Sequence, residues 1–167
     1  MTMIREPEGS DRDSPLDVIE QIVAANDWAF DRPNDQEIAI QIPGRWCDYN
    51  LYCAWNEMTD AMHLNVAFDV RVPPGQRRPI HDLLALVNDK VAMGHFALWR
   101  DEGLVVYRHV LPLRGCAGPT VGQVEDLLET AVDECERFYP AFQYVLWGGK
   151  TAADAMAAAM IETVGEA

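Results

Sequence analysis

Residues 119–151, which read PTVGQVEDLLETAVDECERFYPAFQYVLWGGKT, decide the fold of this chain. Apolar residues recur there every three or four positions, and this spacing predicts a long amphipathic helix with one apolar stripe. The stripe consists of Val121, Val124, Leu127, Leu128, Ala131, Val132, Cys135, Phe138, Tyr139, Phe142, Val145 and Leu146. A stripe of this length requires a broad apolar surface to cover, and the strands predicted upstream supply one.

Local signals mark the start, the end and one irregular point of this helix. Thr120 and Gln123 have the spacing of a capping box, and the glycines after Trp147 end the helix. Pro140 lies inside the pattern and offers no N–H to the carbonyl of Glu136. The sequence therefore predicts a kink or a restart of the helix at Pro140.

The residues before this helix alternate between apolar and polar side chains, which is typical of half-buried strands. Strands are predicted at residues 37–42, 45–56 and 62–72, with a further short strand at 28–30 stopped by a turn at 31–35. The second and third of these three longer strands form the clearest hairpin. A second hairpin is predicted from residues 95–99 and 104–111, and its second strand is apolar on both faces, as in a central strand.

Helices are predicted on either side of these strands. Ser14 caps a short helix that ends near Asn26, Pro79 opens a helix that runs to about Met93 and is capped by Gly94, and an Ala-rich helix runs from Thr151 to about residue 163. The order is α, three or four β, α, two β, long α and a last α. Adjacent strands without strict βαβ alternation predict an α+β fold, an antiparallel sheet of five or six strands with helices packed on it.

Composition limits the class of protein. Residues 1–13 are predicted to be a flexible acidic tail and residues 14–164 a single domain, in a chain of 167 residues that is 49% hydrophobic. The net charge of −14 argues against nucleic-acid and anionic-membrane partners. No apolar run is long enough for a membrane span, and the N-terminus has no signal-peptide pattern. The four cysteines lack metal-site spacing and are expected to be reduced, so we expect a cytoplasmic protein.

Two strings in the chain resemble the YbjN-like family of bacterial sensory transduction regulators. They are LLALVNDKVAMGHFALWRDEGLVVYRHVLPL at residues 83–113 and ERFYPAFQYVLWGGKTAADAM at residues 136–156. The resemblance covers roughly residues 16–160, and its motifs are structural. It implies a fold similar to that of type III secretion chaperones, which are small acidic cytoplasmic homodimers that bind proteins without catalysis. It supplies no catalytic residue to carry over.

Two groups of side chains are candidates for a ligand site. Arg71, Arg77 and Arg78 form a local basic cluster before the helix at Pro79 and could hold an anion or an acidic peptide, or pair with nearby carboxylates. His95 and His109 lie at similar distances from the turn at residues 101–102 and could be cross-strand neighbours. Two imidazoles can begin a metal site, but the sequence shows no third ligand, so ordinary sheet histidines are the alternative.

The aromatic residues suggest an interaction surface. Trp46, Tyr49, Tyr52, Trp55, Trp99 and Trp147 exceed what one face of a small sheet readily hides. Some of them form an exposed apolar patch, or the sheet is covered on both faces. The last helix carries methionines beside alanines, a surface suited to close packing between two copies. The candidate interaction surface is Trp46, Tyr52, Trp55, Met156 and Met160.

These observations predict a non-enzymatic, cytoplasmic, homodimeric module that binds proteins as a chaperone-like or regulatory component of bacterial signalling or stress response. No catalytic residue, cofactor or metal is predicted. The alternative function is a small-ligand or anion-binding domain, or a cryptic enzyme, that uses the arginine cluster or the histidine pair. A deep pocket with convergent polar groups would favour the alternative, and a flat apolar surface would favour the module.

Overall fold

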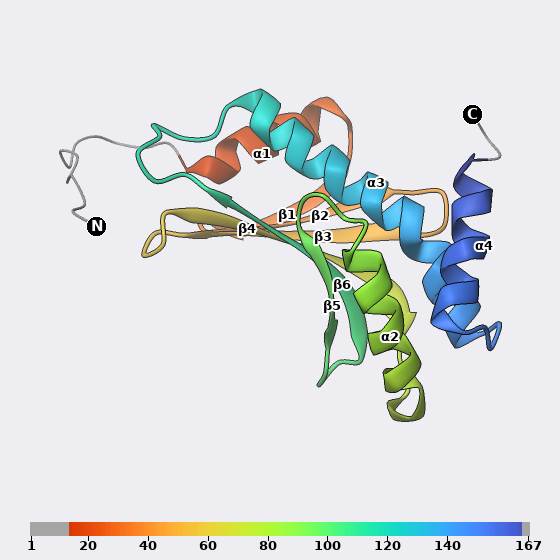
Figure 1. The fold of residues 1–167 in the computed structure, drawn as a ribbon. Coiled ribbons are helices and arrows are strands. Elements are labelled where there is room, and N and C mark those ends of the chain that lie inside the picture. Colours follow the sequence, from red (N-terminus) through yellow and green to blue (C-terminus); the bar gives the residue numbers. More distant parts are fainter. Residues whose placement is uncertain (1–13, 165–167) are drawn as a thin grey trace.

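The computed structural model describes the backbone of residues 14–164 and the side chains of residues 14–161. The predicted acidic tail at residues 1–13 lies outside this range. The described chain forms four α-helices, one short 3₁₀ helix and six strands (Figure 1). In chain order they are α1 (Pro15–Ala25), β1 (Ala29–Asn34), β2 (Glu37–Pro43), β3 (Asp48–Asn56), β4 (Ala61–Arg71), η1 (Pro74–Gln76), α2 (Arg77–Asn88), β5 (His95–Trp99), β6 (Leu104–Pro112), α3 (Val121–Leu146) and α4 (Ala152–Val164).

The six strands form one antiparallel sheet in the order β1-β2-β3-β4-β6-β5. The hairpin of β3 and β4 closes with Asn56 opposite Ala61, and the hairpin of β5 and β6 closes with Trp99 opposite Leu104. β6 lies between β4 and β5, so it is a central strand, as its apolar residues on both faces predicted. The predicted α+β class is confirmed.

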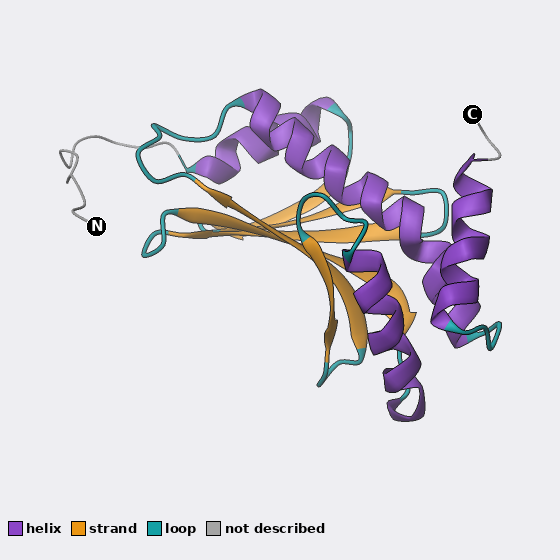
Figure 2. Cartoon of the chain, viewed as in Figure 1, coloured by secondary structure: helices purple, strands orange, loops and turns teal. Residues whose placement is uncertain are grey.

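All four helices lie on the same side of this sheet (Figure 2). α3 runs across the strands with its apolar stripe inward, where Leu128, Ala131 and Phe138 are at most 2% exposed. Val121, at the first position of the helix, is the exception and is 50% exposed. Aromatic rings gather between α3 and the sheet, where Phe68 and Phe96 lie 5.7 Å apart and each contacts Phe142. The other rings in contact with these three are Tyr49, Tyr107, Phe138 and Tyr139. Seven aromatic rings thus form one cluster on the helix face of the sheet.

The predicted ends of α3 and α4 match the structure. The Thr120 hydroxyl accepts from the N–H of Gln123, and the Gln123 side chain accepts from the N–H of Thr120, which completes the capping box. At α4, the Thr151 hydroxyl accepts from the N–H of Asp154 at 3.2 Å and donates to its carboxylate. Gly149, with φ +62°, adopts the left-handed conformation in the connection between the two helices.

Pro140 does not restart the helix, because α3 is continuous from Val121 to Leu146. The carbonyl of Glu136, which Pro140 leaves without its helical donor, accepts from the indole Nε1–H of Trp46 at 3.1 Å. The Trp46 ring also stacks on Tyr139, with centroids 6.4 Å apart and planes 11° apart. The connection between β2 and β3 thus docks on α3 where the helix lacks its own hydrogen bond.

The turn predicted at residues 31–35 is wrong, because β1 continues to Asn34. β1 is an edge strand with one neighbour, β2, and an edge strand tolerates a proline, which has no N–H to donate. The register between β1 and β2 also shifts between Asp31 and Asn34, which accommodates the proline at an irregular position. Arg32 in this segment bonds to α1, and the turn follows at residues 35–36.

The predicted limits of the helix at Pro79 also need correction. α2 begins at Arg77 and ends at Asn88, five residues before the predicted end at Met93. It ends there because the Asn88 side chain turns to β5, where it accepts from the N–H of Phe96 at 2.8 Å and donates to its carbonyl at 3.0 Å. Gly94 does not cap the helix: it precedes β5 at φ +72°, where a Cβ atom would clash with the Tyr107 hydroxyl.

Candidate functional site

The face of the sheet opposite the helices, here called the open face, carries the candidate site. Strand alternation puts Ala39, Tyr52 and Asn65 on this face in one cross-strand row. Residues of β1 to β4 and Trp99 of β5 enclose a shallow cavity of about 690 Å³ there, here called the trough. The trough residues whose side chains belong to the open face are Ala29, Asp31, Ala39, Gln41, Asn50, Tyr52, Asn65, Ala67 and Trp99.

Small side chains form the floor of the trough. Ala29 and Ala39 are exposed, and Ala67 is half-buried. Ala29 lies opposite Gln41, which lies opposite Asn50. Alanine methyl groups leave the sheet backbone close to the surface, so a partner can approach it closely. The trough therefore combines apolar depth with amide groups that can donate and accept hydrogen bonds.

Tyr52 is 38% exposed and provides the central aromatic ring of the trough. The hydrogen bond between its hydroxyl and the Glu37 carboxylate raises the pKa of Tyr52 to about 12. The same hydrogen bond lowers the pKa of Glu37 below its ordinary value. Tyr52 is therefore a neutral donor and Glu37 an anion at physiological pH. On the far side of Tyr52, Arg108 donates its Nε–H to the Asn65 side chain at 3.2 Å.

Both edges of the sheet are protected against the addition of another strand. Pro33 removes a backbone donor from β1, and the register shift around it breaks the regular edge. On β5, the Asn88 side chain occupies the N–H and C=O of Phe96 as a neighbouring strand would. A partner of this protein is therefore expected on a face of the sheet and not along an edge.

The three arginines of the predicted basic cluster make different contacts in the structure. Arg71 donates to the carbonyl of Glu102 at 3.4 Å, and Arg77 donates to the carbonyl of Arg100 at 2.7 Å. Both side chains thus brace the turn between β5 and β6. Arg78 is exposed on α2. None of these three residues lines the trough or either of two other cavities found among residues 14–161.

The two histidines do not face each other. His95 lies opposite Arg108, so strand alternation directs His95 to the open face and His109 to the helix face. His109 is partly buried beside Tyr107, and burial lowers the pKa of its imidazole. Among the described residues, no three His, Cys, Asp or Glu side chains gather closely enough to hold a metal ion.

The residues of the predicted interaction surface lie in different places. Tyr52 belongs to the trough, whereas Trp46 is bonded to α3 and Trp55 lines a different cavity. Met156 needs correction, because it is 8% exposed and packs in the core. Met160 is only partly buried and packs against that core. The alanine side of α4 faces α2 and α3 within the same chain, so this helix uses the small-residue surface for its own packing.

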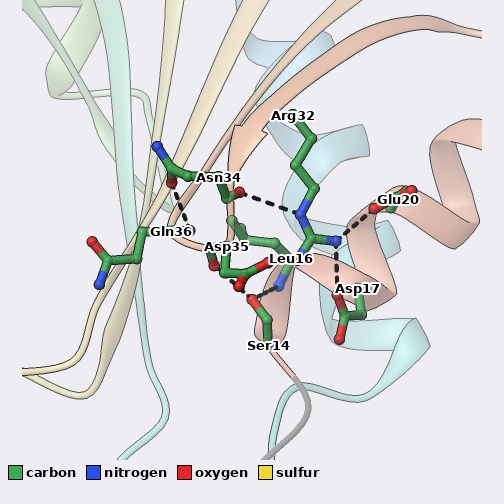
Figure 3. Close-up of polar contacts among 8 residues, drawn as sticks. All are labelled: Ser14, Leu16, Asp17, Glu20, Arg32, Asn34, Asp35 and Gln36. Atoms are coloured by element: carbon green, nitrogen blue, oxygen red, sulfur yellow. Dashed lines mark hydrogen bonds and ion pairs between the residues drawn. The ribbon is translucent and has the colours of Figure 1, made fainter.

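That different cavity, of about 530 Å³, lies beside Arg32 at the start of α1. Figure 3 shows the polar contacts of Arg32 at this place. The Arg32 side chain is 15% exposed and forms ion pairs with Asp17 at 2.7 Å and with Glu20 at 2.5 Å. The hydrogen bond to Glu20 is the largest cause that raises the pKa of Arg32. Ser14 donates to the carbonyl of Asp35 at 2.9 Å. The network fastens α1 to the hairpin of β1 and β2, and its cation is held by carboxylates of the same chain.

Sequence reasoning missed most of the trough and all of the Arg32 network. Ala39 and Gln41 occupy outward positions of a recognised strand, but their neighbours Asn50 and Ala67 come from other strands. The signal is a set of small or amide residues at outward positions, and it becomes readable only when the register is known. Arg32 carries no such signal, because Asp17 and Glu20, the two carboxylates closest to it, lie on α1.

The architecture defines an α+β protein with helices on one face of an antiparallel sheet and an open opposite face. The chain belongs to the YbjN family, described as putative bacterial sensory transduction regulators, whose profile matches residues 15–144. A solved structure described as YbjN, a putative transcription regulator from E. coli, is similar, with a TM-score of 0.52 and 14% identity. That similarity covers 72% of this chain and 85% of the E. coli chain. No curated protein matches this sequence significantly.

Proposed function

We propose that this chain is a non-enzymatic regulatory module that acts by binding another protein at the trough. One observation carries the proposal: the helices cover a single face of the sheet, and the other face keeps an apolar trough of about 690 Å³. A surface of this kind suits protein recognition, because exposed apolar depth is stabilised when a partner removes it from water. The description of the family as sensory transduction regulators supports a regulatory role.

The placement of reactive side chains supports a role without catalysis. Ser14, one of two serines in the sequence, caps α1 and bonds the backbone of Asp35. Cys53 and Cys135 are buried, and burial raises the pKa of both thiols, which keeps them protonated and poorly nucleophilic. The trough itself offers amides, a neutral phenol and alanines, which is a set suited to binding.

The E. coli neighbour is described as a putative transcription regulator, which raises DNA as a partner. The charge of this chain opposes it, because a net charge of −14 repels phosphates. The basic cluster does not offset this repulsion, since Arg71 and Arg77 already bond the turn between β5 and β6. Regulation through a protein contact is therefore favoured.

Two further features of the sequence-based prediction stay part of the proposal. The first is a cytoplasmic location, inferred from the reduced cysteines. The second is the homodimer, for which α4 is no longer the expected interface, because Ala155 and Ala159 are fully buried within one chain. Sedimentation velocity at micromolar concentration tests it: a dimer supports the prediction, and a monomer contradicts it.

None of the helices in residues 14–164 is long and apolar enough to cross a bilayer.

The proposed function is tested by comparing matched variants in affinity capture from native cells. Ala39→Arg places a long charged side chain on the floor of the trough, and Ala85→Arg makes the same change at an exposed position of α2. We expect a stoichiometric protein partner with wild type and Ala85→Arg and its loss with Ala39→Arg. Identical partners for both folded variants would refute the trough as the binding site.

A further inference from the structure

The trough restricts the shape of a partner segment. Pro33 removes one donor from the β1 edge, and Asn88 occupies the N–H and C=O of Phe96 on the β5 edge, so an added strand would leave backbone groups unpaired at either edge of the sheet. An extended segment on the open face would find only a few side-chain amides for its backbone groups. A helix satisfies its own backbone hydrogen bonds and needs only an apolar surface to pack on. The closed edges and the apolar floor together favour a helix.

The dimensions of the trough set the length of this helix. The trough crosses four strands, β1 to β4, which span about 14 Å at the usual strand spacing. A helix rises about 1.5 Å per residue, so about ten residues cover this width. Ala39 and Ala67 leave room for the aliphatic side chains of one helix face. Tyr52 and Trp99 offer ring surface for the same side chains.

The charges around the trough select the sign of the partner. Asp31 is an exposed lining residue, and Glu37 is an anion bonded to Tyr52 on the same face. Arg108, which donates to the lining residue Asn65, adds one positive charge against these two carboxylates. A cationic helix would place its Lys or Arg side chains against the two carboxylates. A second copy of this chain would instead bring the same carboxylates together, in two chains of net charge −14 each.

We propose that the trough binds an amphipathic, cationic helix of a partner protein, with its apolar stripe on Ala39 and Ala67 and its basic residues beside Asp31 and Glu37. This inference rests on the proposed function and specifies the chemistry of its partner. The contact is smaller than a standard interface of about 800 Å² per partner, so the complex is of the weak, reversible kind that suits signalling.

A designed peptide of fourteen residues tests this inference on the full chain. Leucines at helical spacing form one face, and lysines fill the other positions; a matched peptide has glutamate in place of every lysine. Binding is measured by fluorescence anisotropy at two salt concentrations, and the site is mapped by amide chemical shifts in NMR spectra. We expect the lysine peptide to bind at least about tenfold more tightly than the glutamate peptide and to weaken as salt rises.

Matched variants locate the binding. Ala39→Gln fills the floor of the trough without a change in charge, and Ala85→Gln is the control on α2. We expect Ala39→Gln to weaken the lysine peptide by about tenfold, as for a central contact, and Ala85→Gln to leave it unchanged. Asp31→Asn with Glu37→Gln should reduce the salt dependence. Amide shifts confined to the strands of the trough would agree with these effects.

The possible failures are distinguishable. Equal binding of both peptides, or shifts away from the trough, would overturn the cationic helix. If Ala39→Arg still abolished capture of a cellular partner in that case, the proposed function would stand and only the chemistry of the partner would be wrong. A dimer of the wild type that Ala39→Gln dissociates in sedimentation would assign the trough to a second copy and overturn this inference.

Discussion

The hydrogen bond from Trp46 to α3 leads to a testable prediction. A substitution can separate the contribution of this hydrogen bond to stability from that of ring packing. Trp46→Phe keeps an aromatic ring against Tyr139 but removes the indole N–H that serves the carbonyl of Glu136. That carbonyl has no helical donor, because residue 140 is proline. A buried acceptor left unpaired costs about 1–3 kcal/mol, and the partial burial of this bond places the expected loss at about 1–2 kcal/mol.

The expected cost of Trp46→Phe depends on the proline at residue 140, and this dependence provides a control. In Pro140→Ala, residue 140 regains an N–H that can bond Glu136 within the helix. Trp46→Phe should then cost less than about 0.5 kcal/mol, and the double-mutant cycle should give a coupling near 1 kcal/mol. Trp147→Phe is the matched control, because Trp147 is 66% exposed and the same change there should be neutral within about 0.5 kcal/mol.

Urea denaturation followed by far-UV circular dichroism measures all four corners of the cycle without relying on tryptophan fluorescence. Additive losses, within about 0.3 kcal/mol, would show that Pro140 and the indole N–H are independent. The reasoning would then be refuted, and Trp46 would act through ring stacking alone.

Three further predictions follow from burial and charge. Leu128→Ala and Phe138→Ala should each cost on the order of 2–5 kcal/mol in urea denaturation, and losses below about 1 kcal/mol for both would refute the α3 core. Burial raises the pKa of Glu134 above its ordinary 4.5 and outweighs the ion pair of its Oε2 with Arg137 at 3.7 Å, which is too long for a hydrogen bond, so ionisation of Glu134 lowers stability as pH rises. Glu134→Gln should therefore raise the melting temperature more at pH 7 than at pH 4.5, and an equal rise at both would contradict this. Zinc or a chelator should leave the melting temperature unchanged, and a zinc-dependent rise lost in His95→Ala would disprove this.

The parts of the fold that the sequence predicted are those governed by nearby residues. The α3 stripe repeats over seven turns, and its capping box joins residues three apart. The hairpin of β3 and β4 alternates strictly, with inward residues such as Leu51 and Leu64 at most 1% exposed. Periodicity and capping act over a few residues, so one sequence suffices to recognise them.

The parts that were predicted wrongly depend on residues far apart in the chain. The β1 strand passes through Pro33 because an edge position tolerates it, and the edge is defined only by the assembled sheet. The Asn88 side chain ends α2 by bonding Phe96 across a loop. The expected strand from residue 45 begins only at Asp48, because Arg45 and Trp46 bond Glu136 on α3. No local rule predicts such contacts.

The sequence pointed to two residues of the candidate site: Tyr52, and Trp99 as one of the aromatic residues considered for an exposed patch. Tyr52 was expected on an interaction surface and lies in the trough, whereas the arginine cluster and the histidine pair lie outside it. The difficulty is geometric. Asn65 and Ala39 become neighbours of Tyr52 only through the registers of β3 with β4 and of β2 with β3. The sequence shows which side chains point outward, but not which of them meet.

The aromatic residues on the open face are not part of the hydrophobic core, so core packing does not explain their presence. The sequence suggested more rings than one face of the sheet could hold, yet seven rings pack between α3 and the sheet on the helix face. The core is complete without Tyr52 and Trp99. A sheet face that meets only water is usually covered by the aliphatic stems of long charged side chains. The trough has alanines at these positions instead, so its apolar surface stays available, and a partner helix with the opposite charge is the complement that its shape and its carboxylates select.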